Sequence, residues 1–166
     1  SSLVGAIALF RQTMYDAQWY ARATARGDVL HQPALKTLNE GLNGPKIFEI
    51  SNSLSLRNVN DLRKEFALDF IVKGVGREYL LPEETPVGTK MILPLNFPKA
   101  WDVSDPYLAR MVSLEDLKHW ELAPYNPRLL VERGVQVALS RDTLCSAKKF
   151  LANLHRAVKC GLSHDE

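Results

Sequence analysis

The chain has 166 residues, of which 46% are apolar and 24% are charged. This is the composition of an ordinary globular protein, and it excludes a wholly disordered chain, a collagen and a disulfide-stapled miniprotein. With 21 lysines and arginines against 19 aspartates and glutamates, the net charge of +2 gives no electrostatic reason to expect a nucleic acid or an acidic membrane surface as a partner, and no apolar run is long enough to span a membrane.

The first 44 residues predict a helical lead-in. Apolar residues recur at helical spacing from Val4 to Ala21, which predicts an amphipathic helix over residues 3–26 that ends at Gly27. A second, shorter helix is predicted over residues 33–42. The chain begins without a methionine and runs straight into a helical pattern, so we expect it to be a processed or partial chain.

From residue 45 onward, short apolar runs alternate with helical patterns. The predicted strands are 46–50, 69–73, 91–93 and 135–139, and the predicted helices are 57–66, 113–122, 127–133 and 143–159. Ser113 is a good N-cap, with Asp116 at the capping-box position. Strands that alternate with helices pair in parallel. The predicted fold class is therefore α/β, with four βα units over 45–166 and strands that are buried on both faces.

Two cysteines, Cys145 and Cys160, fall in one predicted helical stretch, in which Cys160 follows the last residue of helix 143–159. Fifteen residues of helix separate them by about 22 Å, which is too far for a disulfide. A CxxC motif is absent, so a thiolate zinc site is not expected. The cysteines leave the cellular compartment open.

Ligands of parallel α/β folds bind at the carboxyl ends of the strands, so polar residues there are the candidates for chemistry. At the four strand ends these residues are Glu49, Ser51, Asn52, Lys73, Arg77, Glu78, Asn96, Lys99, Ser140, Arg141 and Asp142. A carboxylate inside a strand, such as Glu49, needs a cation, a metal or a hydrogen-bond network. Structural roles are the alternative for two others: Asp142 as the N-cap of the last helix, and Asn96 as the support of a proline-rich loop.

Two further patterns carry less chemistry. Residues 74–76 form a lone GxG, which is typical of a tight turn. None of the four histidines lies at a predicted strand end, and HxH and HExxH motifs are absent, so the chain by itself does not predict a histidine metal site. His119 is interpreted as a packing or surface residue of its helix.

Several stretches resemble imidazolonepropionase-like amidohydrolases, which are metal-dependent hydrolases, in a branch common in Bacteroidetes-type bacteria. The stretches are GAIALFRQTMYDA at 5–17, IFEISN at 47–52, FIVKGVGREY at 70–79, LNFPK at 95–99, MVSL at 111–114, HWELAP at 119–124 and VALSRD at 137–142. The resemblance covers nearly the whole chain. It implies a partial (β/α)8 TIM barrel in which this chain supplies strands five to eight.

The resemblance implies hydrolysis of amide or cyclic amide C–N bonds, with a divalent metal of the zinc type to activate water and a carboxylate to move the proton. Asp142 matches the family's eighth-strand aspartate and is the candidate catalytic residue. Glu49 stands at the fifth-strand histidine position and is the candidate metal ligand, while Lys73 or Gly74 stands at the sixth. Further candidates, for substrate binding, are Asn52, Lys73 and Asn96. Because the HxH strand is missing, we expect the metal to be absent from this chain.

The expected function is thus that of a hydrolase fragment, inactive as this piece, whose parent acts on a small-molecule amide. Three alternatives stay open: a degenerate, non-catalytic barrel that serves for binding or scaffolding, a second and complete barrel elsewhere in the polypeptide, and an independent α/β binding domain with an open sheet. Half a barrel leaves strand edges uncovered, so we expect homo-oligomers formed through these edges. The resemblance implies a bacterial source and leaves export open.

Overall fold

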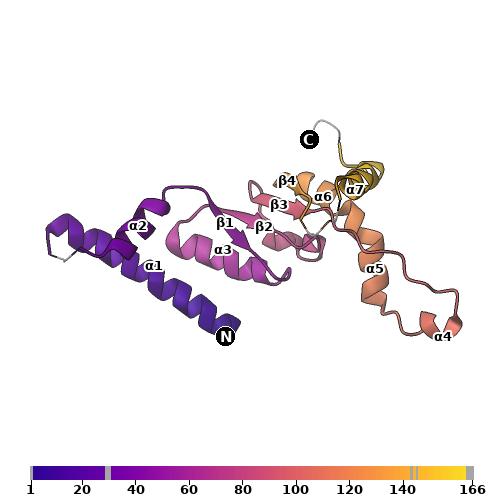
Figure 1. Ribbon diagram of the computed structural model, residues 1–166, viewed down its shortest axis with the longest axis horizontal. Helices are drawn as coiled ribbons and strands as arrows, with labels where there is room; N and C mark the ends of the chain where they lie inside the picture. The colour runs from indigo at the N-terminus through magenta and orange to yellow at the C-terminus, as the bar shows by residue number, and fades with distance from the viewer. Residues whose placement is uncertain (1, 29–30, 143, 145, 164–166) are drawn as a thin grey trace. The chain divides into compact units, whose positions relative to one another are not determined.

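The computed structural model describes residues 2–28, 31–142, 144 and 146–163 (Figure 1). The helices are α1 (Leu3–Arg26), α2 (Pro33–Gly41), α3 (Ser55–Phe66), α4 (Pro106–Ala109), α5 (Leu114–Leu122), α6 (Asn126–Val131) and α7 (Ala147–Lys159). The strands are β1 (Lys46–Glu49), β2 (Phe70–Lys73), β3 (Lys90–Pro94) and β4 (Gln136–Ser140). Each predicted strand and helix is therefore present, with ends that differ by a few residues. None of the helices in the described ranges is long and apolar enough to cross a membrane.

Two compact units make up the chain, one of residues 1–46 and 61–70, the other of residues 47–60 and 71–166. In the first unit, the Phe66 ring makes edge-to-face pairs with the rings of Phe10 and Tyr15, with centroids 6.2 and 5.1 Å apart. The neighbouring Glu65 carboxylate accepts 2.7 Å hydrogen bonds from Arg11 Nε and from the Tyr15 hydroxyl. This unit is thus stabilised by an aromatic cluster and by the hydrogen bonds of the adjacent Glu65 carboxylate.

The second unit is built around the sheet, whose strand order β1-β2-β3-β4 follows the chain. β2 pairs in parallel with β3, and β3 with β4, so that Lys73 lies beside Ile92, and Ile92 beside Ala138. The prediction of a four-stranded parallel sheet is confirmed. Because parallel strands end at the same edge, the polar residues that follow them come together at that edge.

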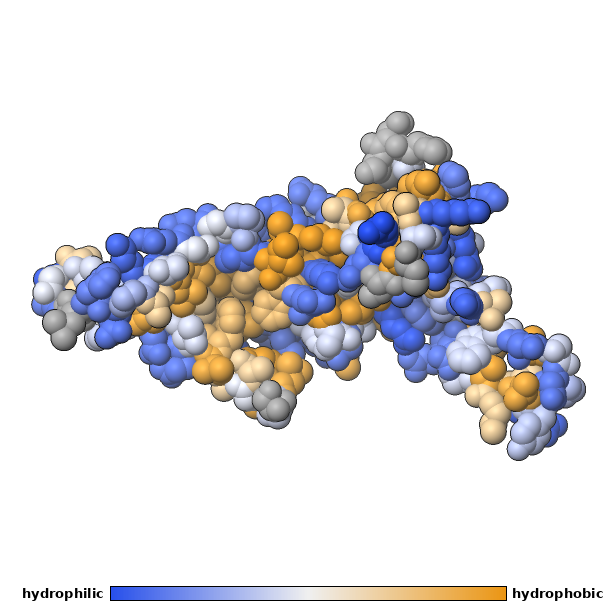
Figure 2. Space-filling model, in the orientation of Figure 1, coloured by the Kyte–Doolittle hydropathy of each residue, from blue (hydrophilic) through white to orange (hydrophobic). Residues whose placement is uncertain are grey.

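The two faces of the sheet differ in burial. Side chains on one face are buried, among them Ile50, Val72, Met91 and Leu93. Side chains on the other are exposed or half-buried, and we call this the open face: Ile47, Glu49, Ile71, Lys73, Lys90, Ile92, Gln136 and Ala138. Figure 2 shows hydrophobic surface in the middle of the view, where Figure 1 has the strands. The expectation that both faces are buried is therefore wrong for the described residues.

The connection between β2 and β3 also differs from the predicted repeat of strand and helix. Two short 3-10 turns, Glu78–Leu80 and Pro82–Glu84, replace a full helix there. Pro82 lacks the backbone N–H that a longer helix would need from it, and Pro86 stops any continuation. The later helices follow the prediction more closely, since Ser113 Oγ accepts from Asp116 N at 3.1 Å and caps α5.

Candidate functional site

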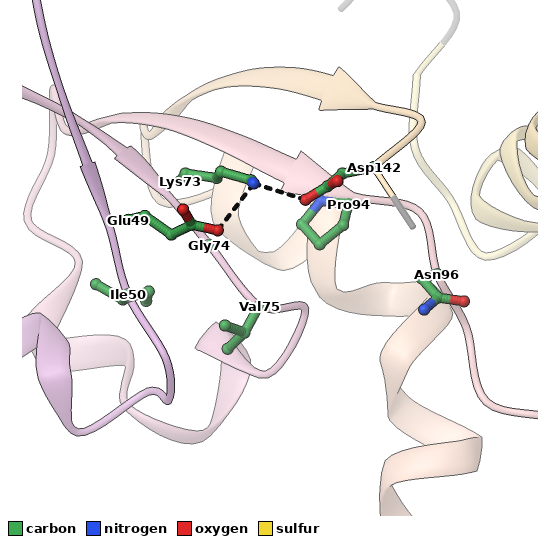
Figure 3. A pocket seen from close by; sticks show the side chains of 8 residues that line it. All are labelled: Glu49, Ile50, Lys73, Gly74, Val75, Pro94, Asn96 and Asp142. Atoms are coloured by element: carbon green, nitrogen blue, oxygen red, sulfur yellow. Dashed lines mark hydrogen bonds and ion pairs between the residues drawn. The ribbon is translucent and has the colours of Figure 1, made fainter. Parts of the chain in front are cut away.

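Three charged side chains meet at the carboxyl edge of the sheet (Figure 3). Glu49 is the last residue of β1, Lys73 is the last residue of β2, and Asp142 follows β4 by two residues. Lys73 Nζ lies 2.9 Å from Glu49 Oε1 and 2.7 Å from Asp142 Oδ2. One ammonium group therefore joins carboxylates that come from opposite edges of the sheet.

The last helix begins later than predicted, and Asp142 pairs with Lys73 instead of capping that helix. α7 starts at Ala147, and its N-cap is Ser146, whose hydroxyl accepts from Lys149 N at 3.3 Å. The alternative in which Asp142 caps this helix is therefore wrong. Instead, Asp142 lies in a turn where its backbone N–H donates to Ser140 Oγ at 3.0 Å, and its carboxylate faces Lys73.

The three charged residues line an open hollow of about 240 Å3. Its other lining residues are Ile50, Gly74, Val75, Pro94 and Asn96, so that Asn96 joins the site from the end of β3 (Figure 3). Asn52 does not line it. The Asn52 side-chain oxygen accepts from the backbone N–H of Ser55 at 3.0 Å and from its hydroxyl at 3.1 Å, at the start of α3. The structure thus brings together Glu49, Lys73, Asn96 and Asp142, and places Asn52 at a helix terminus.

The three charged side chains differ in their exposure to solvent. The side chain of Glu49 is 70% exposed, that of Asp142 39% and that of Lys73 28%. Hydrogen bonds to Asp142, then to Glu49, raise the pKa of the Lys73 ammonium above its ordinary value, against a smaller opposing effect of burial. Lys73 therefore stays positively charged at neutral pH, where it lies between the two carboxylates.

The buried carboxylate of Glu78 holds the turn that follows Lys73. Glu78, placed on the polar rim by the sequence, is fully buried. Its carboxylate accepts hydrogen bonds from Val75 N at 2.6 Å, from Gly76 N at 3.1 Å and from Asn126 Nδ2 at 2.7 Å. This arrangement confirms residues 74–76 as a tight turn, with Gly76 at a φ of 84° that favours glycine. Glu78 thereby fixes the backbone that directly follows Lys73.

Gly74 fits this arrangement because it has no side chain. A Cβ atom added there would lie 2.5 Å from Glu78 Oε1 and 3.1 Å from a methyl group of Leu93. The space beside residue 74 is therefore filled by the Glu78 carboxyl group. The sequence offered one signal for this, namely a glutamate closely following two glycines, which is also common in ordinary turns.

In the segment that follows the 74–76 turn, the Tyr79 hydroxyl lies 3.0 Å from His119 Nδ1. Burial and, to a smaller extent, Arg77 lower the pKa of His119, while three carboxylates oppose this shift, those of Asp116, Glu115 and Glu78. The unfolded chain thus binds the histidine proton at a higher pH than the folded chain, and stability is lost as the pH falls through and below about 6.5. The rings of Tyr79 and His119 also stack, with centroids 6.2 Å apart, which agrees with the interpretation of His119 as a helix-packing residue.

We expect His119→Gln to flatten this pH dependence. Between pH 7.5 and pH 5, the urea midpoint of the original chain should fall by more than that of the variant, because glutamine has no proton to bind. Urea unfolding at several pH values, followed by circular dichroism, measures the difference. Equal pH dependence in both chains would show that His119 titrates alike in the folded and unfolded states.

The resemblance to amidohydrolases implies a divalent metal, so the donors at this edge matter. Among the described residues, no group of three or more His, Cys, Asp or Glu side chains lies close enough together to hold a metal ion. Glu49 and Asp142 are the two carboxylates here, and the Lys73 ammonium bonds to both. Two carboxylates already joined by a cation do not fit a divalent metal. Cys145 lies outside the described residues, and Cys160 is a free thiol.

Comparisons of the chain with protein-family models, with curated proteins and with solved structures give no match.

Proposed function

We propose that this chain supplies half of a (β/α)8 barrel hydrolase of the amidohydrolase type, which acts on amide or cyclic amide C–N bonds of a small molecule. The observation that carries the proposal is the position of Asp142. This aspartate follows the last strand of a parallel sheet in chain order, and it faces Lys73 in a hollow at the carboxyl edge. Barrel enzymes carry their catalytic residues at that edge.

The open face of the sheet supports the barrel half of the proposal. In a closed barrel, one face of the sheet packs against an outer ring of helices and the other lines the interior. Here Val72 and Leu93 lie on the buried face, while Ile71 and Ile92 lie on the open face. An interior face without its opposing strands would have this mixture of half-buried isoleucines and charged groups at the carboxyl end.

Each residue of the site has a proposed role. Asp142 takes a proton from water and returns it to the leaving nitrogen, the work of a general base and acid. Asn96 binds a polar group of the substrate, and Glu49, the most exposed of the three charged residues, stands at the entrance to the hollow. The family's metal would polarise the substrate carbonyl when bound. The described residues do not form a site for it, so this chemistry would need ligands from outside the described residues.

The proposal is tested with the complete natural polypeptide that contains residues 1–166. We expect it to hydrolyse members of a panel of N-acyl amino acids and five- and six-membered cyclic amides, assayed with and without added zinc or manganese. Asp142→Asn should lower turnover by at least a hundredfold, since general acid–base catalysis contributes about 10²–10⁴ in rate. The matched control is Asp61→Asn, on the exposed surface of α3. Unchanged turnover in Asp142→Asn would remove Asp142 from the mechanism.

A second candidate function is a non-catalytic barrel that binds a small molecule or serves as a scaffold. The ion pairs that join Lys73 to both carboxylates favour this second function, because the charges of the three groups are already used in binding one another. Binding of a cyclic amide, detected by calorimetry and weakened in Asp142→Asn, together with no turnover under any metal condition, would identify this second function. Residues 1–166 alone are expected to be inactive in either case.

A further inference from the structure

The geometry points to Lys73 as the resident cation of this site, which takes the place of a divalent metal between Glu49 and Asp142 and binds the carbonyl oxygen of the substrate. This inference rests on the proposed function for its substrate, but not for its principal test. It assigns to the chain's own ammonium group the role that the family resemblance gives to a metal.

The Lys73 ammonium group lies between two carboxylates. Lys73 Nζ is within hydrogen-bond distance of one carboxylate from β1 and another from the segment after β4, at 2.9 and 2.7 Å. These segments lie at the two edges of the sheet, and the lysine reaches both from β2. A cation that bound the two carboxylates together would need the same space. The ammonium would then have to leave, or stay within a few ångströms of a divalent positive charge.

The Lys73 ammonium group can make one more hydrogen bond than its two carboxylate partners use. A lysine ammonium has three N–H donors. Among the described residues, Glu49 and Asp142 accept two of them, which leaves the third for an oxygen atom in the hollow. The side chain is 28% exposed and lines the hollow, which makes this donor reachable. A carbonyl oxygen placed there would have Asp142 close by, since both groups bind the same lysine.

Lys73 and Asp142 together would support hydrolysis of a C–N bond. Water adds to the carbonyl carbon while Asp142 takes its proton, and the new negative charge on the carbonyl oxygen is stabilised by Lys73. The C–N bond then breaks, and the proton on Asp142 passes to the leaving nitrogen. The products are a carboxylic acid and an amine, and no oxidant, reductant or metal takes part in the balance.

Binding of Mn²⁺ to residues 1–166 is the principal test, because manganese prefers oxygen ligands and so avoids the two cysteines and the histidines elsewhere. We expect the original chain to show no stoichiometric binding in a titration followed by electron paramagnetic resonance. Lys73→Met removes the ammonium and leaves two carboxylates, so its affinity for Mn²⁺ should rise at least tenfold. Lys73→Gln is a second variant with the same expectation, in case the methionine variant does not fold.

The matched control is Lys90→Met, a lysine on the same open face at the start of β3, which should bind manganese no better than the original chain. Two results would overturn the inference. One is stoichiometric binding of manganese by the original chain that is lost in Glu49→Gln. The other is an affinity in both Lys73 variants, folded by circular dichroism, that equals that of the original chain.

Activity gives an independent readout in the complete polypeptide. Turnover should survive a chelator, and Lys73→Arg, which keeps the charge, should lose less of kcat than Lys73→Met. Turnover that is lost with the chelator and restored by zinc would contradict the inference while leaving the proposed hydrolase in place. Absence of turnover would count against the hydrolase alone, because the manganese titration does not depend on it.

Discussion

Glu78→Gln should lower the free energy of unfolding by about 3 kcal/mol, the cost of leaving buried hydrogen-bond donors without a charged acceptor. Both oxygens of the Glu78 carboxylate accept from N–H groups: Oε1 from Val75 N and Gly76 N, and Oε2 from Gly76 N and Asn126 Nδ2. Glutamine replaces one oxygen with an NH2 group. In either orientation of the amide, a donor then faces a donor in a fully buried place.

The matched control is Glu115→Gln. The Glu115 side chain is 74% exposed and pairs with Arg77 at 2.8 Å, and a surface ion pair of this kind contributes at most about 1 kcal/mol. Urea unfolding of both variants and of the original chain, followed by circular dichroism, gives the two losses directly. A loss for Glu78→Gln no larger than that of the control would mean that the loop after β2 does not depend on this carboxylate.

Residues 1–166 should form a dimer in which a second copy covers the open face. Parallel sheets in proteins are almost always covered on both faces, and this one is covered on one. Its strand order leaves β1 and β4 as the two edges. In a twofold dimer, β4 of one copy would pair in parallel with β1 of the other, and the same pairing would occur a second time. The eight strands would then close into a barrel of the size that side chains fill.

A second copy is the partner proposed because it would pair with both edges at once, whereas a single added strand would pair with one. Light scattering behind a sizing column should therefore give twice the mass of one chain. Ile47→Lys puts a charge on the open face, where Ile47 is 62% exposed, and should shift the mass to that of a monomer.

Leu151→Lys is the control for that substitution, since Leu151 is also an exposed apolar residue, 51% accessible, but lies on α7. It should leave the dimer unchanged. A monomer of the original chain at high concentration would instead favour an independent α/β binding domain with an open sheet.

Local patterns predicted the fold well where the signal is short in range. Ser113 with Asp116 predicted the start of α5, and Gly27 predicted the end of α1, because capping residues act on their own helix. The start of α7 was predicted too early. Its apolar spacing continues upstream, and the capping residue Ser146 is one of several polar residues in that segment.

The candidate site could be predicted in part, because parallel strands gather whatever follows them at one edge. That rule found Glu49, Lys73, Asn96 and Asp142. It could not tell that Lys73 reaches across to both carboxylates, since a side-chain bridge depends on the three-dimensional distance between strands. Nor could it separate Glu78 from its polar neighbours, because its side-chain partner Asn126 lies 48 residues further along the chain.

Gly74 and Glu78 also constrain how this chain could change in evolution. The Glu78 carboxyl group occupies the volume into which any side chain at residue 74 would grow, at 2.5 Å from an added Cβ. A histidine could not arise at that position through one substitution without clashing with Glu78, and loss of Glu78 first would leave the turn amides without an acceptor. Each residue thus makes replacement of the other harder, and a metal-ligating side chain at residue 74 would need paired changes.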